Sequence, residues 1–99
     1  MKTIDLNADV GEGIGPASVA ADAELLALVS SANISCGAHA GNTDTIRAVI
    51  EQALRLGCAL GAHPSFPDRE HFGRRELDLA PAVIEKFVAE QVAELKSLV

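Results

Sequence analysis

The sequence contains no tryptophan and no tyrosine, and only three phenylalanines among its 99 residues. Aromatic side chains therefore contribute little to the core, which has to be built from Ala, Val, Leu and Ile. Nearly half of the residues, 48%, are hydrophobic, which is the composition of a folded domain and not of a disordered segment. A chain of this length allows one domain at most.

Basic residues are also scarce. Eight Lys and Arg stand against 14 Asp and Glu, which gives a net charge of −6. Because phosphate backbones are bound by basic surfaces, a nucleic-acid partner is not expected. No apolar run approaches the ~20 residues of a membrane span. No apolar stretch typical of a signal peptide follows Lys2. These absences predict a cytoplasmic protein with no membrane partner.

Cysteine is limited to Cys36 and Cys58. They are expected at the exit of the second strand and the entrance of the third. Between parallel neighbours, about four residues of rise, roughly 13 Å, would separate them, whereas a disulfide needs Cα atoms within ~7 Å. Free thiols are therefore expected. Cys36 is either a nucleophile beside His39 or, as is commoner for cysteine, a small buried apolar residue.

Short apolar strands alternate with helical segments along the chain. The pattern predicts strands at 3–7, 32–35 and 59–63, helices at 21–29, 43–56 and from 81 onward, and long loops at 11–16 and 64–79. Asn42 or Thr43 is expected to cap the middle helix, and Gly57 to follow its end. The expected buried helix residues are Leu25, Leu28 and Val29, then Ile46, Val49, Ile50, Ala53 and Leu54, then Ile84, Phe87, Val88, Val92 and Leu95.

The order of strands and helices predicts an α/β fold with a parallel sheet and right-handed crossovers. One face of the strands is apolar and the other is polar or small, whereas a doubly wound sheet would be apolar on both faces. A polar inner face with long loops at the carboxyl ends of the strands suits a (β/α) barrel. Three βα units cannot close a barrel, so residues 1–99 are expected to form the N-terminal part of one. The apolar face comprises Ile4, Leu6, Ala32, Ile34, Leu60 and Ala62, and the polar face Asp5, Asn7, Asn33, Ser35, Gly61 and His63.

Carboxylates and imidazoles gather at the expected strand ends. Asp5 and Asp9 are candidate catalytic carboxylates, although Asp5 could equally make a structural hydrogen bond or ion pair. His39 and His63 end the second and third strands and are candidate acids or electrophiles. Together with Asp9 they have the composition of a His-His-carboxylate site for a divalent metal, and no tight motif such as HExxH strengthens that reading.

Amides and guanidinium groups complete the candidate site. Asn7 and Asn33 lie on the polar face and are expected to bind substrate. Arg74 and Arg75 could clamp a carboxylate or phosphate, and one of the two is expected to be a surface ion pair instead. His71 is expected to be a loop residue without a special role.

Four segments carry a family resemblance. They read IDLNADVGEG at 4–13, SANISCGAHAG at 31–41, GAHPSFPD at 61–68 and FGRR at 72–75. This ordered set resembles the LamB/YcsF family, known functionally as the first of the three subunits of the prokaryotic 5-oxoprolinase. Ala38, Asn42 and Ala80 depart from the residues common in that family, and none of these departures removes a candidate catalytic group.

The resemblance implies a (β/α) barrel related to those of the glycoside hydrolases and deacetylases. It implies a hydrolase that opens the lactam of 5-oxoproline to L-glutamate with ATP as co-substrate, in a complex with the 5-oxoprolinase subunits B and C. Family members are much longer than this chain. The chain alone is therefore expected to be inactive and to self-associate through an open sheet edge. The alternatives are a metal-dependent carbohydrate deacetylase and a non-catalytic fragment that docks to the partner subunits.

Overall fold

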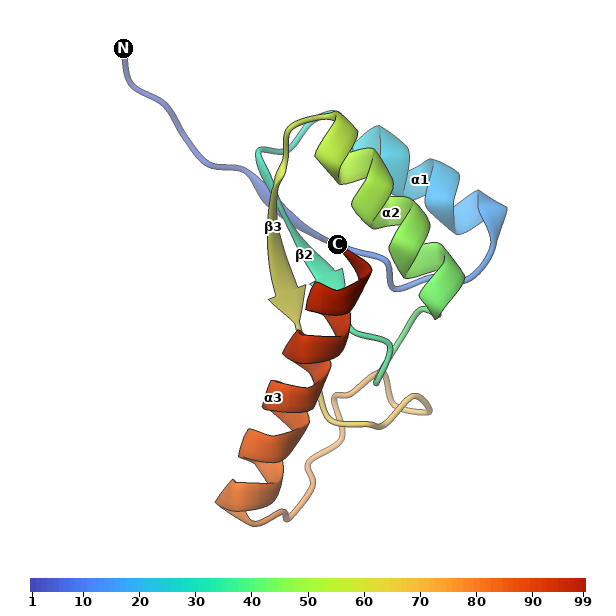
Figure 1. Cartoon of the computed structure of the whole chain (residues 1–99), viewed down its shortest axis with the longest axis vertical. Coiled ribbons are helices and arrows are strands. Elements are labelled where there is room, and N and C mark those ends of the chain that lie inside the picture. Colours follow the sequence, from blue (N-terminus) through green and yellow to red (C-terminus); the bar gives the residue numbers. More distant parts are fainter.

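The computed structural model describes residues 1–99 and shows an α/β fold in which three strands alternate with three helices (Figure 1). The elements are β1 (Asn7–Val10), α1 (Pro16–Leu26), β2 (Ser31–Ser35), α2 (Thr43–Arg55), β3 (Ala59–His63) and α3 (Pro81–Leu98). The strands form one parallel sheet in the order β1-β2-β3. The predicted α/β class and parallel strand direction are confirmed, while the (β/α) barrel stays a prediction. None of the helices is both long and apolar enough to cross a membrane.

The strand sidedness is largely as predicted, and one face of the sheet carries the core. Ala32 and Ile34 of β2 are fully buried, and Val10 of β1 is 1% exposed. These side chains join residues from all three helices in a single hydrophobic cluster. The opposite face presents the polar residues Asn7, Asp9 and Asn33.

The first strand is shifted from its predicted position. It begins at Asn7, where its pairing with Ser31 of β2 begins. The preceding residues have no further strand to pair with, so the side chains of Ile4 and Leu6 are 80% and 52% exposed and do not join the core. The predicted alternation of apolar and polar residues was right. Val10, which is separated from Ile4 and Leu6 by an even number of positions, is the residue that is buried.

The first helix also begins earlier than predicted. Pro16 occupies its first turn, a position that suits proline because no helical hydrogen bond is lost there. Leu26 is the residue that reaches the core, while Leu25 and Leu28 are 38% and 74% exposed. The abundance of alanine in this segment weakens its periodicity, and the predicted buried face was wrong except for the partly buried Val29.

Helix α2 follows its prediction closely. The side chain of Asn42 caps it by accepting a hydrogen bond of 2.9 Å from the Thr45 amide. Gly57 follows its end with φ of 73°, the left-handed conformation typical of a helix terminus. The stripe Ile46, Val49, Ile50 and Ala53 is buried, but Leu54 is 53% exposed.

Helix α3 packs most closely through its last turns. Leu95 is buried, and the amide of buried Gln91 bonds both backbone groups of Ser65, at 2.9 and 2.6 Å. Gln91 thereby ties the loop after β3 to the helix. The predicted buried stripe was wrong for Ile84, Val88 and Val92, whose exposures are 37%, 43% and 41%. The first turns of α3 extend away from the sheet (Figure 1).

The two cysteines are free, as predicted, and both are buried. Burial raises the pKa of the Cys36 thiol, which disfavours the nucleophilic thiolate. The structure therefore favours the apolar, structural reading of Cys36.

Candidate active site at the strand ends

The carboxyl ends of the three strands enclose a small polar cavity of about 170 Å³. Parallel strands end at one edge of a sheet, so the segments that follow them meet there. The cavity is lined by Asp9, Glu12, His39, His63, Ser65, Phe72, Gly73 and Arg74.

The turn after β1 directs Glu12 into this cavity. Gly11 adopts φ of 77°, and its amide donates a 2.9 Å hydrogen bond to Asp22 of α1, which fixes the turn. Gly41, from the loop after β2, lies directly against the Gly11 carbonyl, and a Cβ at Gly41 would overlap that oxygen. Glycine at position 41 therefore allows the two loops to pack together.

The loop after β2 holds His39 in a buried position. The Ser35 hydroxyl donates to the Ala40 carbonyl at 2.7 Å. Arg69 donates to the carbonyls of Gly37 and Gly41, each at 2.6 Å. These bonds close a tight loop around His39, which is only 3% exposed.

The two histidines and two carboxylates lie close together without direct hydrogen bonds. His39 Nε2 is 3.7 Å from Glu12 Oε2, and His63 Nδ1 is 3.8 Å from Asp9 Oδ1 and 3.9 Å from Glu12 Oε1. The imidazole centroids are 4.9 Å apart, and Phe72 meets the His39 ring edge-on at 5.4 Å. All three nitrogen–oxygen distances exceed the usual hydrogen-bond length.

The environment of His39 favours its neutral form. Burial lowers the pKa of this imidazole, and the nearby His63 and Arg69 act in the same direction, while Glu12 opposes them. The Nδ1 atoms of His39 and His63 are both buried and have no hydrogen-bond partner. Unpaired buried nitrogens of this kind are rare and call for a physical explanation.

Asp9 is held from behind by an amide ladder on the polar face. Asn33 Nδ2 donates to Asp9 Oδ1 at 3.1 Å and to Asn7 Oδ1 at 2.8 Å. The structure thus brings the predicted residues Asn33 and Asn7 into one row with Asp9. Asn33 orients the carboxylate, while Asn7 lies one step further from the cavity.

Asp5 is not brought to the cavity. It accepts hydrogen bonds from the Ser30 hydroxyl and, at 3.0 Å, from the Ser31 hydroxyl. These bonds lower the pKa of the Asp5 carboxyl. Ser31 begins β2, so Asp5 lies at the opposite end of the strands from His39. This geometry favours a structural hydrogen-bonding role for Asp5, which is one of the two roles considered from the sequence.

The two predicted arginines have different positions. Arg74 lines the cavity, and its guanidinium carbon lies 5.0 Å from the centre of the Phe72 ring. Arg75 points instead to buried Asp68, with 3.5 Å between Nε and Oδ2. As expected, one of the pair makes an ion pair, and Arg74 is the one at the cavity.

Comparison with known proteins supports the family resemblance. The family model described as LamB/YcsF family matches residues 4–99. The chain belongs to the LamB/YcsF family. Its structure is similar to the crystal structure of a lactam utilization protein from Thermus thermophilus, with a TM-score of 0.90 and 42% sequence identity. The match covers 98% of this chain and 39% of the other, so this LamB/YcsF chain spans well under half the length of that relative.

Several residues that line the candidate site or contact its loops were not singled out from the sequence. Glu12, which lines the cavity, is the first of these. Its position between Gly11 and Gly13 was an available signal, because flanking glycines turn a side chain sharply out of a strand. Arg69 and Phe72 carried no such signal, since their contacts with the loop after β2 arise only from the fold.

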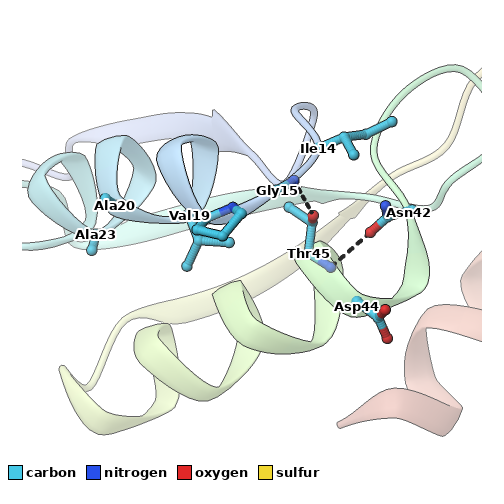
Figure 2. A pocket seen from close by; sticks show the side chains of 9 residues that line it. Ile14, Gly15, Val19, Ala20, Ala23, Asn42, Asp44 and Thr45 are labelled. Carbon is cyan, nitrogen blue, oxygen red and sulfur yellow. Dashed lines mark hydrogen bonds between the residues drawn. The ribbon is translucent and has the colours of Figure 1, made fainter.

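A larger cavity of about 510 Å³ lies between α1 and α2 of this LamB/YcsF chain, away from the strand ends. Figure 2 shows its lining, which includes Ile14, Val19 and Ala23 beside the capping pair Asn42 and Thr45. Asp44 is its only ionisable residue. Although this cavity is the larger one, the groups capable of acid–base catalysis line the smaller cavity at the strand ends.

Proposed function

We propose that this chain supplies the strand-end site of a 5-oxoprolinase, as part of the first of its three subunits, and that the enzyme opens the lactam of 5-oxoproline to L-glutamate with ATP. Membership of the LamB/YcsF family supports this proposal, as does the likeness to a protein described by its role in lactam utilization. The observation that carries it is the cavity in which Asp9, Glu12, His39 and His63 converge.

The reaction adds water to the lactam carbonyl and breaks its carbon–nitrogen bond. Asp9 is the general base, because its carboxylate is held by Asn33 while its side chain remains 51% exposed to solvent. It takes a proton from the attacking water and returns it to the departing amine. On the buried side of the cavity, imidazole N–H groups of His39 and His63 face the lactam oxygen and polarise it by donating hydrogen bonds.

Arg74 binds the carboxylate of the substrate. Its guanidinium group lies over Phe72 at the cavity wall, which restrains the side chain while its nitrogen donors remain exposed. Arginine matches a carboxylate with two parallel hydrogen bonds. A cavity of about 170 Å³ is smaller than the ~300–1,000 Å³ of sites for drug-sized ligands, in keeping with one small ring.

ATP is handled outside this chain, by subunits B and C or by further family sequence. The sequence contains no phosphate-binding P-loop motif. A lactam is a stable amide, so coupling to ATP serves to activate its carbonyl. The polar face of the sheet would then line the interior of a (β/α) barrel, whose far wall encloses the substrate.

The proposal is tested in a chimaera in which this chain replaces its matched segment of the Thermus thermophilus relative. With ATP, 5-oxoproline and subunits B and C, the chimaera should form glutamate. His63→Ala and Asp9→Ala should abolish turnover with little change in the unfolding midpoint, because both side chains lie at the cavity rim. Glu51→Gln, on the exposed face of α2, is the matched control.

Binding of 5-oxoproline to the isolated chain, followed by NMR, gives a second readout that does not depend on folding of the chimaera. Arg74→Ala should weaken this binding. The proposal is overturned if the chimaera forms no glutamate and the chain does not bind 5-oxoproline. It is also overturned if the His63→Ala variant keeps wild-type turnover.

Deacetylation of a carbohydrate amide is the second candidate, favoured by the pairing of two imidazoles with carboxylates at the strand ends. Release of acetate from an N-acetylated sugar by the same chimaera, without ATP, would support it over lactam opening.

A further inference from the structure

We propose that Glu12, His39 and His63 bind one divalent transition-metal ion, with Zn²⁺ as the best match to this donor set. Each residue offers one ligand atom, and the three atoms lie within 4.8 Å of one another. Two imidazoles and one carboxylate are a known ligand set of catalytic zinc. The ion's chemical role rests on the proposed function, but its binding is a separate property of these side chains.

The distances between the ligand atoms are close to those of a coordination sphere. In a tetrahedral site with metal–ligand bonds of about 2.0–2.1 Å, neighbouring ligand atoms lie about 3.3 Å apart. The Glu12 carboxylate is 3.7 Å from His39 Nε2 and 3.9 Å from His63 Nδ1. Because all three atoms lie within 4.8 Å of one another, their separations have to shorten by no more than about 1.5 Å to place them on one ion.

The alternative of a direct hydrogen-bond network fits the geometry less well. These separations exceed hydrogen-bond length, although His39 is 3% exposed and held in a tight loop. His63 Nδ1 is buried without a partner. Ligation through that nitrogen would supply the partner that the protein does not provide.

The structure selects Glu12 over Asp9 as the carboxylate ligand, in contrast to the set expected from the sequence. Asp9 Oδ1 already accepts a hydrogen bond from Asn33, and the Asp9 side chain is 51% exposed against 21% for Glu12. Three protein ligands leave a fourth position open toward the cavity, the arrangement of a catalytic metal site. An ion there would polarise the lactam oxygen as a Lewis acid, with Asp9 beside it as the base.

The test is titration of the purified, EDTA-treated chain with Co²⁺, followed by its visible absorption, and then with Zn²⁺ as competitor. One equivalent of Co²⁺ should bind and be displaced by Zn²⁺. Glu12→Gln and His39→Asn should each raise the Kd by at least about tenfold, since even the loss of indirect partners of a metal site costs that much. Glu51→Gln, on the exposed face of α2, is the matched control and should bind as the wild type does.

Asp9→Asn distinguishes the two carboxylates and should retain binding. The inference is overturned if the wild-type chain binds no Co²⁺, or if Glu12→Gln and His39→Asn bind it normally while keeping the wild-type circular dichroism spectrum. It is also overturned if Asp9→Asn abolishes binding and Glu12→Gln does not. The titration contains no substrate, so the two proposals can fail independently. Absence of ion binding would not refute lactam opening, and absence of turnover would not refute the ion site.

Discussion

At the scale of single residues, Asp68 is the most deeply buried carboxylate of the chain, at 5% exposure. Burial alone would raise its pKa, but the hydrogen bond from His71, at 3.1 Å, and the charge of Arg75 outweigh burial and lower the pKa below 3.8. Its backbone carbonyl also accepts a 2.7 Å bond from Gly73, which lines the cavity. Asp68 therefore anchors the loop that carries Phe72 and Arg74.

We expect Asp68→Asn to destabilise the chain at pH 7 and to lose that effect in acid. A carboxylate with a lowered folded-state pKa stabilises the fold above its unfolded pKa, near 3.8, and loses this contribution as the pH falls through the folded value. Urea midpoints of both proteins at pH 7 and below pH 3.8 measure the difference. Asp78→Asn, in the exposed part of the same loop, is the control, and a constant difference at every pH would contradict the assignment.

Residue types at strand ends could be read from the sequence, but their exact partners could not. Asp9, His39 and His63 were found because polar side chains follow apolar strands at the edge where parallel strands end. Arg74 and Arg75 are adjacent and chemically identical, so only the fold shows which one lies at the cavity. Contacts between segments far apart in the sequence, such as Arg69 with Gly37, have no local signal.

At the scale of the elements, β2 is the central strand and the best-buried part of the sheet. It pairs with β1 on one side and β3 on the other, and its Ala32 and Ile34 are fully buried. Leu60 of β3 occupies the same apolar face but is only partly buried, because β3 lies at the edge.

Truncations along the apolar face should show this gradient. Ile34→Ala should lower the free energy of unfolding by ~2–5 kcal/mol, the range for fully buried aliphatic side chains. Leu60→Ala should cost less, and Ile4→Ala, at 80% exposure, should change it by no more than ~0.5 kcal/mol. Chemical denaturation of the three variants tests the order. A large loss for Ile4→Ala would restore the first strand to its sequence-predicted position.

Element types were predictable here, whereas their bounds depended on pairing. Helix α2 has a cap, an amphipathic stripe and a terminal glycine, and each signal agreed with the others. Strand β1 could not be bounded from its alternation alone, because the alternation continues through residues that find no partner strand. Helix α1 is rich in alanine, which marks neither a buried nor an exposed face.

At the scale of the whole molecule, the chain leaves apolar surface and sheet edges uncovered. Both β1 and β3 have a single partner strand. A groove of about 320 Å³ runs beside β3 and α3, lined by Leu60, Ala62, Val92, Leu95 and Val99 among others. Further along α3, Ile84 and Val88 are also exposed. Open edges and apolar grooves of this kind favour association with other chains.

The last prediction joins this exposed surface to the open site: the isolated chain should self-associate and form no glutamate from 5-oxoproline and ATP. The polar face of Asn7, Asp9 and Asn33 faces solvent in this chain, and electrostatic stabilisation of a charged transition state weakens where water enters.

Sedimentation velocity should show species larger than a monomer, and Val88→Lys should shift the distribution toward the monomer by placing a charge on the exposed face of α3. Lys86→Ala, on the same helix, is the control for a change of surface charge. A coupled glutamate assay on the same samples completes the test. A monodisperse wild-type monomer that produces glutamate unaided would show that these three strands already enclose a complete site, because only a water-excluding cavity could then account for turnover.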